Sequence, residues 1–179
     1  CAQNKDIIVI PGIEIETCEE VHVVCLFPTL ADAQEINLLI RKHLPAILNR
    51  EDIFGEQILY DEYDQIAGYE EQLLVTATSL SIEKVKNKVE ELGGIAIPAH
   101  IDRSSFSIIS NLGFIPEELN FTAVELSKKV NIQEFIAKNP EIEKYRLVKN
   151  SDAHFLYDIS ERENYLNLEE KSIECLISY

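Results

Sequence analysis

The stretch Ile95-Ala96-Ile97-Pro98-Ala99-His100 is an apolar run, typical of a buried β-strand, that ends directly in a histidine. Three other segments pair such a run with metal-ligating residues: Ile7–Ile10 before Pro11-Gly12-Ile13-Glu14, Val21–Phe27 around His22, and Arg146–Ser151 before Asp152 and His154. A βα barrel builds its active site from polar residues at the C-terminal ends of buried strands. The sequence therefore predicts a metal-dependent hydrolase.

Strand patterns alternate with helical patterns along the rest of the chain. The clearest helix is expected from Ser81, its N-cap, to Leu92, and a longer one from Thr29 to about Asn49 is interrupted by Pro45. Further strands are expected at 122–126, around 147–148 and at 165–168, and further helices at 106–112, 132–137 and 169–177. This alternation implies βαβ units and a parallel sheet or barrel.

Residues 55–70 have a different character. Two short β-type segments, 57–60 and 65–69, flank an acidic turn at 61–64. This pattern predicts a β-hairpin insertion into a single domain of 179 residues. The hairpin is interpreted as a lid, an edge or a peripheral decoration.

The charge of the chain bears on its partners. The net charge is −16, from 16 Lys and Arg against 32 Asp and Glu. Such a surface repels nucleic-acid backbones and anionic membranes, so we expect a small phosphorylated substrate and neither long nucleic acid nor a membrane.

The four cysteines, Cys1, Cys18, Cys25 and Cys175, form no regular framework, which favours reduced thiols and a cytoplasmic location. Oligomeric state is left open.

Each ligand signal has an ordinary alternative when it is taken alone. The Asp152-Ala153-His154 triplet fits a capped turn, Glu14 fits a surface residue, and His22 fits a hydrogen-bonded core histidine. His43, the fourth histidine, lies on a predicted helix outside the set. The conjunction of ligand types on four strand-like segments favours a metal site.

The motifs Pro-Gly-Ile-Glu-Ile (11–15), Val-His-Val-Val (21–24), Pro-Ala-His-Ile-Asp (98–102) and Asn-Ser-Asp-Ala-His (150–154) resemble those of the polymerase and histidinol phosphatase (PHP) domain family. The resemblance runs from about Asp6 to the last helix and is closest to the stand-alone metal-dependent phosphoesterases. It implies a distorted seven-stranded (β/α) barrel with two or three divalent transition-metal ions. Because His and carboxylate ligands suit several metals, Zn, Mn and Fe all remain candidates.

The resemblance also implies roles for individual residues. Glu14 would bridge metals, and the other metal ligands would be His22, His100, Asp152 and His154, with Glu14, Asp152 and His154 carrying the catalysis. Arg103 is a candidate phosphate clamp because its guanidinium matches phosphate in a bidentate fashion, although an exposed arginine is an equal alternative. Ser104, Ser105 and Lys128 are weaker candidates.

The family's first motif, a His-x-His pair, is absent, as is a further ligand histidine that normally follows it. The chain opens at Cys1 shortly before a strand pattern, so we expect an N-terminally truncated domain. The leading functional hypothesis is hydrolysis of a small phosphorylated metabolite or nucleotide by metal-bound hydroxide. The alternatives are a 5′–3′ exonuclease or nucleotide phosphatase, and a non-catalytic, metal-binding regulatory domain.

Overall fold

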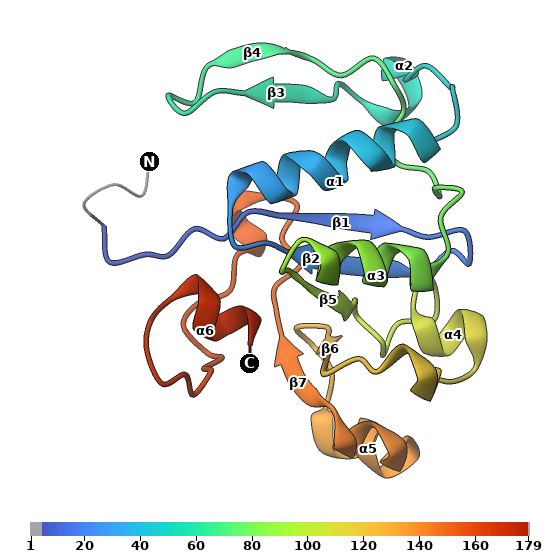
Figure 1. Cartoon of the computed structure of the whole chain (residues 1–179), viewed down its shortest axis with the longest axis vertical. Coiled ribbons are helices and arrows are strands. Elements are labelled where there is room, and N and C mark those ends of the chain that lie inside the picture. The colour runs from blue at the N-terminus through green and yellow to red at the C-terminus, as the bar shows by residue number, and fades with distance from the viewer. Residues whose placement is uncertain (1–4, 179) are drawn as a thin grey trace.

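A computed structural model describes residues 5–178, and its centre is a three-stranded antiparallel sheet (Figure 1). Strands β1 (Gly12–Glu16) and β2 (His22–Leu26) form a hairpin, and β5 (Ile95–Pro98) pairs with the other edge of β2. Only residues 17–21 connect β1 to β2. A connection this short cannot contain the crossover that a parallel pair needs, so the two strands must be antiparallel.

The two faces of this sheet have different roles. Ile15, Val23 and Cys25 are buried in the main core, together with Phe27. Side chains alternate between faces along a strand, and the partners in register, Glu16 with His22 and Glu14 with Val24, therefore lie together on the opposite face. The same register thus builds a core on one side and gathers polar ligand types on the other.

Two helices cover the core side of the sheet. Helix α1 (Leu30–His43) is capped by the Thr29 side chain and ends just before Pro45, and α3 (Ile82–Glu91) is capped by Ser81. Both helices bury one apolar stripe, as amphipathic surface helices do. Gly94 follows α3, and a Cβ there would lie 2.5 Å from the Leu26 carbonyl oxygen, so the close approach of helix and strand requires glycine.

The expected insertion is a separate two-stranded hairpin. Strands β3 (Ile58–Tyr60) and β4 (Ile66–Tyr69) pair with each other alone, with α1 between them and the central sheet and the short helix α2 (Glu51–Phe54) at one end of the hairpin (Figure 1). Two antiparallel strands are thus present within residues 55–70, while the interpretation of this hairpin as an insertion into a single domain stays a prediction.

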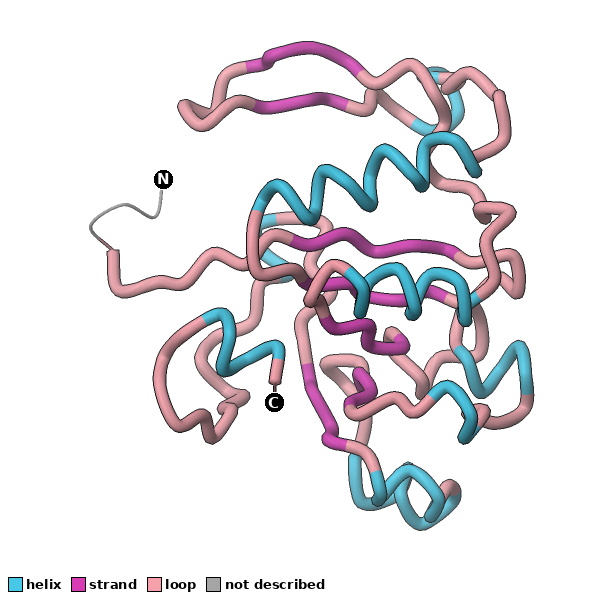
Figure 2. The backbone as a smooth tube through the Cα atoms, viewed as in Figure 1, coloured by secondary structure: helices cyan, strands magenta, loops and turns pink. Residues whose placement is uncertain are grey.

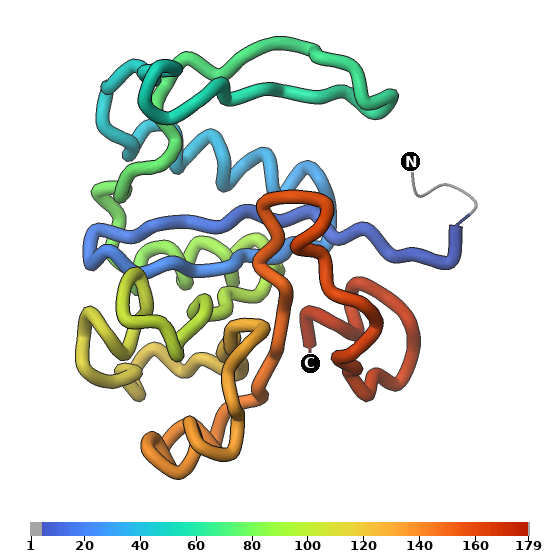
Figure 3. The backbone as a smooth tube through the Cα atoms, turned by 180° about the vertical axis from the view of Figure 1, so that it is seen from behind, coloured from blue at the N-terminus to red at the C-terminus, as the bar shows by residue number. Residues whose placement is uncertain are grey.

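The remaining strands form a parallel pair, β6 (Ala123–Leu126) with β7 (Arg146–Lys149). The other regular elements of the described chain are short: α4 (Ile108–Leu112), α5 (Ile132–Lys138), α6 (Ile173–Ile177), and 3₁₀ turns at Glu117–Leu119, Pro140–Lys144 and Leu156–Asp158. Figure 2 shows that most of the chain after β7 is loop. This segment runs behind the sheet (Figure 3), where Leu166 and Leu176 line an apolar pocket with residues of β2 and β5.

The expectation of a closed seven-stranded βα barrel is wrong. Within residues 5–178 the strands form three small separate sheets, of which only β6–β7 is parallel. Residues 7–10 and 165–168 are irregular, and the first strand begins instead at Gly12, which places Glu14 inside a strand. Ile7 is 62% and Val9 65% exposed, so the apolar run that predicted a buried strand is not buried.

Two smaller observations complete the fold. Cys18, Cys25 and Cys175 are free, as expected, whereas Cys1 lies outside the described residues. Among the helices of the described chain, none has the length and apolar character that crossing a membrane requires.

Candidate metal centre

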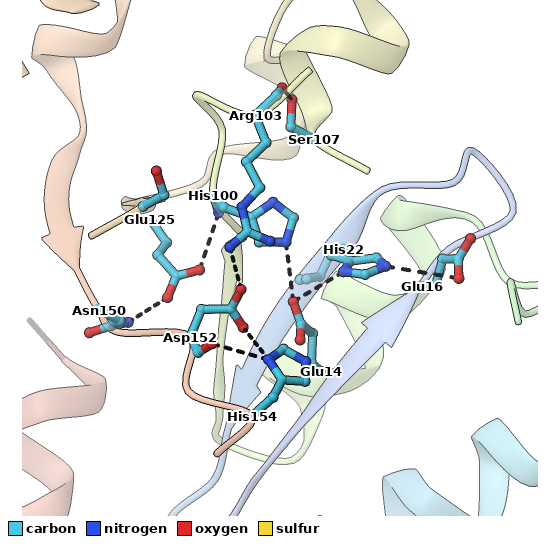
Figure 4. A network of polar contacts seen from close by, with 12 residues as sticks. Glu14, Glu16, His22, His100, Arg103, Ser107, Glu125, Asn150, Asp152 and His154 are labelled. Atoms are coloured by element: carbon cyan, nitrogen blue, oxygen red, sulfur yellow. Dashed lines mark hydrogen bonds and ion pairs between the residues drawn. The ribbon is translucent and has the colours of Figure 1, made fainter. Parts of the chain in front are cut away.

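Glu14, His22 and His100 bring their ligand atoms together on the side of the sheet opposite the main core (Figure 4). The Oε1 atom of Glu14 lies 3.2 Å from His22 Nδ1 and 3.5 Å from His100 Nε2. All three ligand atoms lie within 4.8 Å of one another. Ligands held about 2.0–2.2 Å from one tetrahedral ion are roughly 3.4 Å apart, so this spacing suits a shared divalent metal.

The sheet register explains how Glu14 and His22 meet. His22 begins β2 directly opposite Glu16, and Glu14 is its diagonal neighbour on the same face. Glu16 Oε2 lies 3.9 Å from His22 Nε2, on the other side of the ring. His22 also stacks on Phe106, with ring centroids 4.9 Å apart. The ring is therefore held by a carboxylate on each side and by an aromatic neighbour.

His100 reaches the cluster through an unusual backbone conformation. If side chains continued to alternate between the two faces after β5, the His100 side chain would point away from Glu14. Its φ of 30° instead bends the chain and turns the ring toward Glu14. A non-glycine residue in this region is uncommon and often marks a functional site. The side chain is 2% exposed, and its Nδ1 atom has no hydrogen-bond partner in the described structure.

The electrostatics of the cluster favour a cation. Hydrogen bonds from His100 and His22 lower the pKa of Glu14 to about 2, so this carboxylate is anionic at neutral pH. In turn, the hydrogen bond to Glu14 raises the pKa of His22. An ionised carboxylate beside two imidazoles is a donor set that binds Zn, Mn or Fe ions.

Asp152 and His154 lie next to the cluster but face other partners (Figure 4). Asp152 accepts a hydrogen bond from Arg103 at 2.6 Å. The His154 side chain is 71% exposed, and its Nδ1 lies 3.1 Å from the backbone oxygen of Asp152. The structure therefore groups three of the five expected ligands, and the roles of Asp152 and His154 as ligands stay predictions.

A buried carboxylate, Glu125, joins the two loops behind the cluster. Its Oε2 accepts the backbone N–H of His100 at 3.1 Å, and its Oε1 accepts the Asn150 amide at 2.7 Å. Burial raises the pKa of Glu125. Sequence analysis missed this residue, although a single glutamate within the apolar run Ala123-Val124-Glu125-Leu126 was a signal of a buried polar role.

A pocket of about 570 Å³ opens beside Asp152. Its lining combines cationic, hydroxyl and acidic groups: Arg103, Ser127, Lys128, Lys129, Ser151, Asp152 and Asp158. Arg103 and Lys128 were expected near the substrate. Lys129 was missed, and Ser104 and Ser105 do not line this pocket.

Comparison with known proteins identifies the fold but not a family. No family model matches the chain, and no curated protein matches it. Two solved structures are similar: the lesion-specific endonuclease PfuEndoQ from Pyrococcus furiosus, with 19% identity and a TM-score of 0.50, and endonuclease Q in complex with a 27-mer duplex substrate, with 18% identity and a TM-score of 0.52. Each match covers 80% of this chain but only 30% or 31% of the other protein.

The chain therefore shares the fold of a part of endonuclease Q. At 18–19% identity this likeness concerns the fold alone, and membership of the PHP family stays a prediction. The expectation that long nucleic acid is excluded is wrong, since one similar structure holds a duplex substrate at its active site. A net charge of −16 is a sum over the whole chain and does not describe a pocket lined by three cations.

Proposed function

We propose that this chain is a metal-dependent phosphodiester hydrolase of the nuclease type. The observation that supports the proposal best is the shared carboxylate of Glu14, placed between His22 and His100 at metal-ligand spacing. The fold shared with a part of endonuclease Q supports the same reading. Because the matches cover only 30% or 31% of endonuclease Q, the activity and substrates of this protein are proposed and not inferred from the likeness alone.

Glu14, His22 and His100 would hold the metal, and the fit rests on their donor atoms and spacing. A divalent ion bound there supplies Lewis acidity, which lowers the pKa of a coordinated water and offsets phosphoryl charge. Glu14 contributes a permanent negative charge because its pKa is about 2. A coordinating imidazole nitrogen must be unprotonated, and the hydrogen bond to Glu14 raises the pKa of His22, so metal affinity would fall as the pH is lowered.

Arg103 is the proposed clamp for the reacting phosphate. Its guanidinium holds the Asp152 carboxylate at 2.6 Å, at the boundary between the cluster and the pocket. A phosphate that enters from the pocket would offer the same pair of acceptor oxygens as that carboxylate. Arg103 therefore orients the phosphate next to the metal ligands.

The proposal is tested by hydrolysis of bis(4-nitrophenyl) phosphate and of a labelled oligonucleotide, with Mn²⁺ or with EDTA. Glu14→Gln and His100→Asn should each lower kcat/KM by more than about 100-fold, because even changes behind the ligands cost about 10- to 100-fold. Glu83→Gln on α3 and His43→Asn on α1 are matched controls outside the cluster and should retain activity. Circular dichroism checks that each variant folds.

Two outcomes would overturn the proposal. One is hydrolysis that survives in both Glu14→Gln and His100→Asn. The other is a wild-type chain that binds Mn²⁺ but hydrolyses neither substrate, which would instead support the non-catalytic, metal-binding alternative.

A further inference from the structure

The turn after β6 carries two adjacent lysines, Lys128 and Lys129, on the wall of the pocket beside the cluster. Asp102 fixes this turn: the Ser127 backbone N–H donates to Asp102 Oδ1 at 2.7 Å, and the Ser127 hydroxyl donates to Oδ2 of the same carboxylate. Asp102 itself follows His100 by two residues. The two lysines are therefore held in a set position relative to a candidate metal ligand.

Neither of these two lysines forms an ion pair within residues 5–178. Lys128 Nζ donates to the backbone oxygen of Asp158 at 3.3 Å, which orients the ammonium and leaves its other N–H groups available. Neither lysine has a carboxylate within 4.0 Å in the part of the chain that the structure describes. Two acidic residues, Asp152 and Asp158, also line the pocket, and Asp152 is paired with Arg103. The lining therefore has one more cationic than acidic side chain, in a chain with twice as many acidic as basic residues, and this local excess favours an anionic ligand.

The pocket is larger than one phosphate group needs. Its volume of about 570 Å³ lies within the range of about 300–1,000 Å³ for ligand pockets. Arg103 and Asp152 form the side next to the cluster, and Lys128 and Lys129 add a second cationic part to the lining. A strand with consecutive phosphates would place one at each part.

We propose that Lys128 and Lys129 form a subsite for a backbone phosphate that flanks the phosphodiester being cleaved. This inference rests on the function proposed for the neighbouring cluster and names its substrate class as a nucleic-acid strand. The subsite adds affinity without reading base sequence, as contacts to phosphates do. It also explains how an acidic protein can bind a polyanion at one place.

Binding of a fluorescein-labelled single-stranded 12-mer, measured by anisotropy in EDTA over a series of KCl concentrations, tests the subsite without cleavage. For the double variant Lys128→Ala/Lys129→Ala we expect weaker binding, and a slope of log K against log [KCl] that is shallower by about 0.7, the contribution of one single-strand phosphate contact. The matched control is Lys84→Ala/Lys138→Ala, which removes the same charge from exposed helix positions.

The subsite is wrong if the two double variants weaken binding equally, because the effect would then come from net charge alone. It is also wrong if Lys128→Ala/Lys129→Ala binds like the wild type. Both variants should still bind Mn²⁺ as the wild type does, which shows that the cluster is intact. If only the subsite proposal is wrong, the wild type still hydrolyses bis(4-nitrophenyl) phosphate. If the proposed function itself is wrong, the wild type does not hydrolyse this substrate.

Discussion

At the scale of single residues, Glu125 links the loop that carries His100, a candidate metal ligand, to the loop that carries Asn150. This buried carboxylate accepts one hydrogen bond from the His100 loop and one from the Asn150 loop, which precedes Asp152. The His100 backbone is in a left-handed conformation, which costs energy unless its surroundings hold it. Glu125 is therefore expected to act as a positioning residue for His100.

Replacement of Glu125 should affect both metal binding and stability. In Glu125→Ala the buried backbone N–H of His100 loses its acceptor, at a cost of about 1–3 kcal/mol, and the affinity for Mn²⁺ should fall about 10- to 100-fold. Glu125→Gln retains one acceptor oxygen and should show a smaller loss in both measurements. Calorimetric titration and thermal unfolding measure these effects, with the exposed Glu118→Ala as control. An Mn²⁺ affinity that is unchanged in Glu125→Ala would contradict the positioning role.

At the scale of elements, the β3–β4 hairpin depends on a few polar contacts with the body of the protein. Glu70, at the end of β4, forms an ion pair with Arg41 of α1. Gln57, before β3, donates to the backbone oxygens of Glu70 and Gln72 at 2.8 Å each. Residues of the hairpin itself, such as Tyr60 and Ile66, are more than half exposed. With little apolar burial, the hairpin should open more easily than the rest of the molecule.

The Glu70–Arg41 pair gives the attachment of the hairpin a defined pH dependence. The hydrogen bond from Arg41 lowers the pKa of Glu70 below its ordinary 4.5. A carboxyl whose pKa is lower in the docked state stabilises docking fully above its ordinary pKa, and this contribution is lost as the pH falls below that value and through the lowered pKa of the docked state. Hydrogen exchange at residues 58–69 should therefore be faster in Glu70→Gln than in the wild type at pH 7. This difference should shrink toward pH 4, and a difference that does not change with pH would contradict the account.

At the scale of the whole molecule, the sequence predicted local elements better than their arrangement. The caps at Thr29 and Ser81 and the apolar run before His100 are local signals, and each marks a real boundary. The pairing of β5 with β2 joins distant segments of the chain, which periodicity does not encode. The antiparallel β1–β2 pair follows from the short connection 17–21, but the first strand was expected at residues 7–10. The alternation of strands and helices therefore suggested a parallel barrel that the structure does not have.

For the candidate site too, the residue types were predicted from the sequence, whereas several contacts between them were not. Glu14, His22 and His100 were predicted together from ligand chemistry, and the structure places them at metal-ligand spacing. The pairing of Asp152 with Arg103, the support from Glu125 and the contribution of Lys129 depend on three loops meeting in space. Such contacts between distant segments could not be read from one sequence.

The central claim is that the chain binds a divalent metal through Glu14, His22 and His100. The most direct test is Mn²⁺ titration by calorimetry on chelator-treated protein, with metal per chain measured by elemental analysis. The account predicts at least one ion per chain in the wild type and in Glu83→Gln, and a large loss of affinity in Glu14→Gln and in His100→Asn. A wild-type chain that binds no metal, or a Glu14→Gln chain that binds it as tightly as the wild type, would contradict the claim.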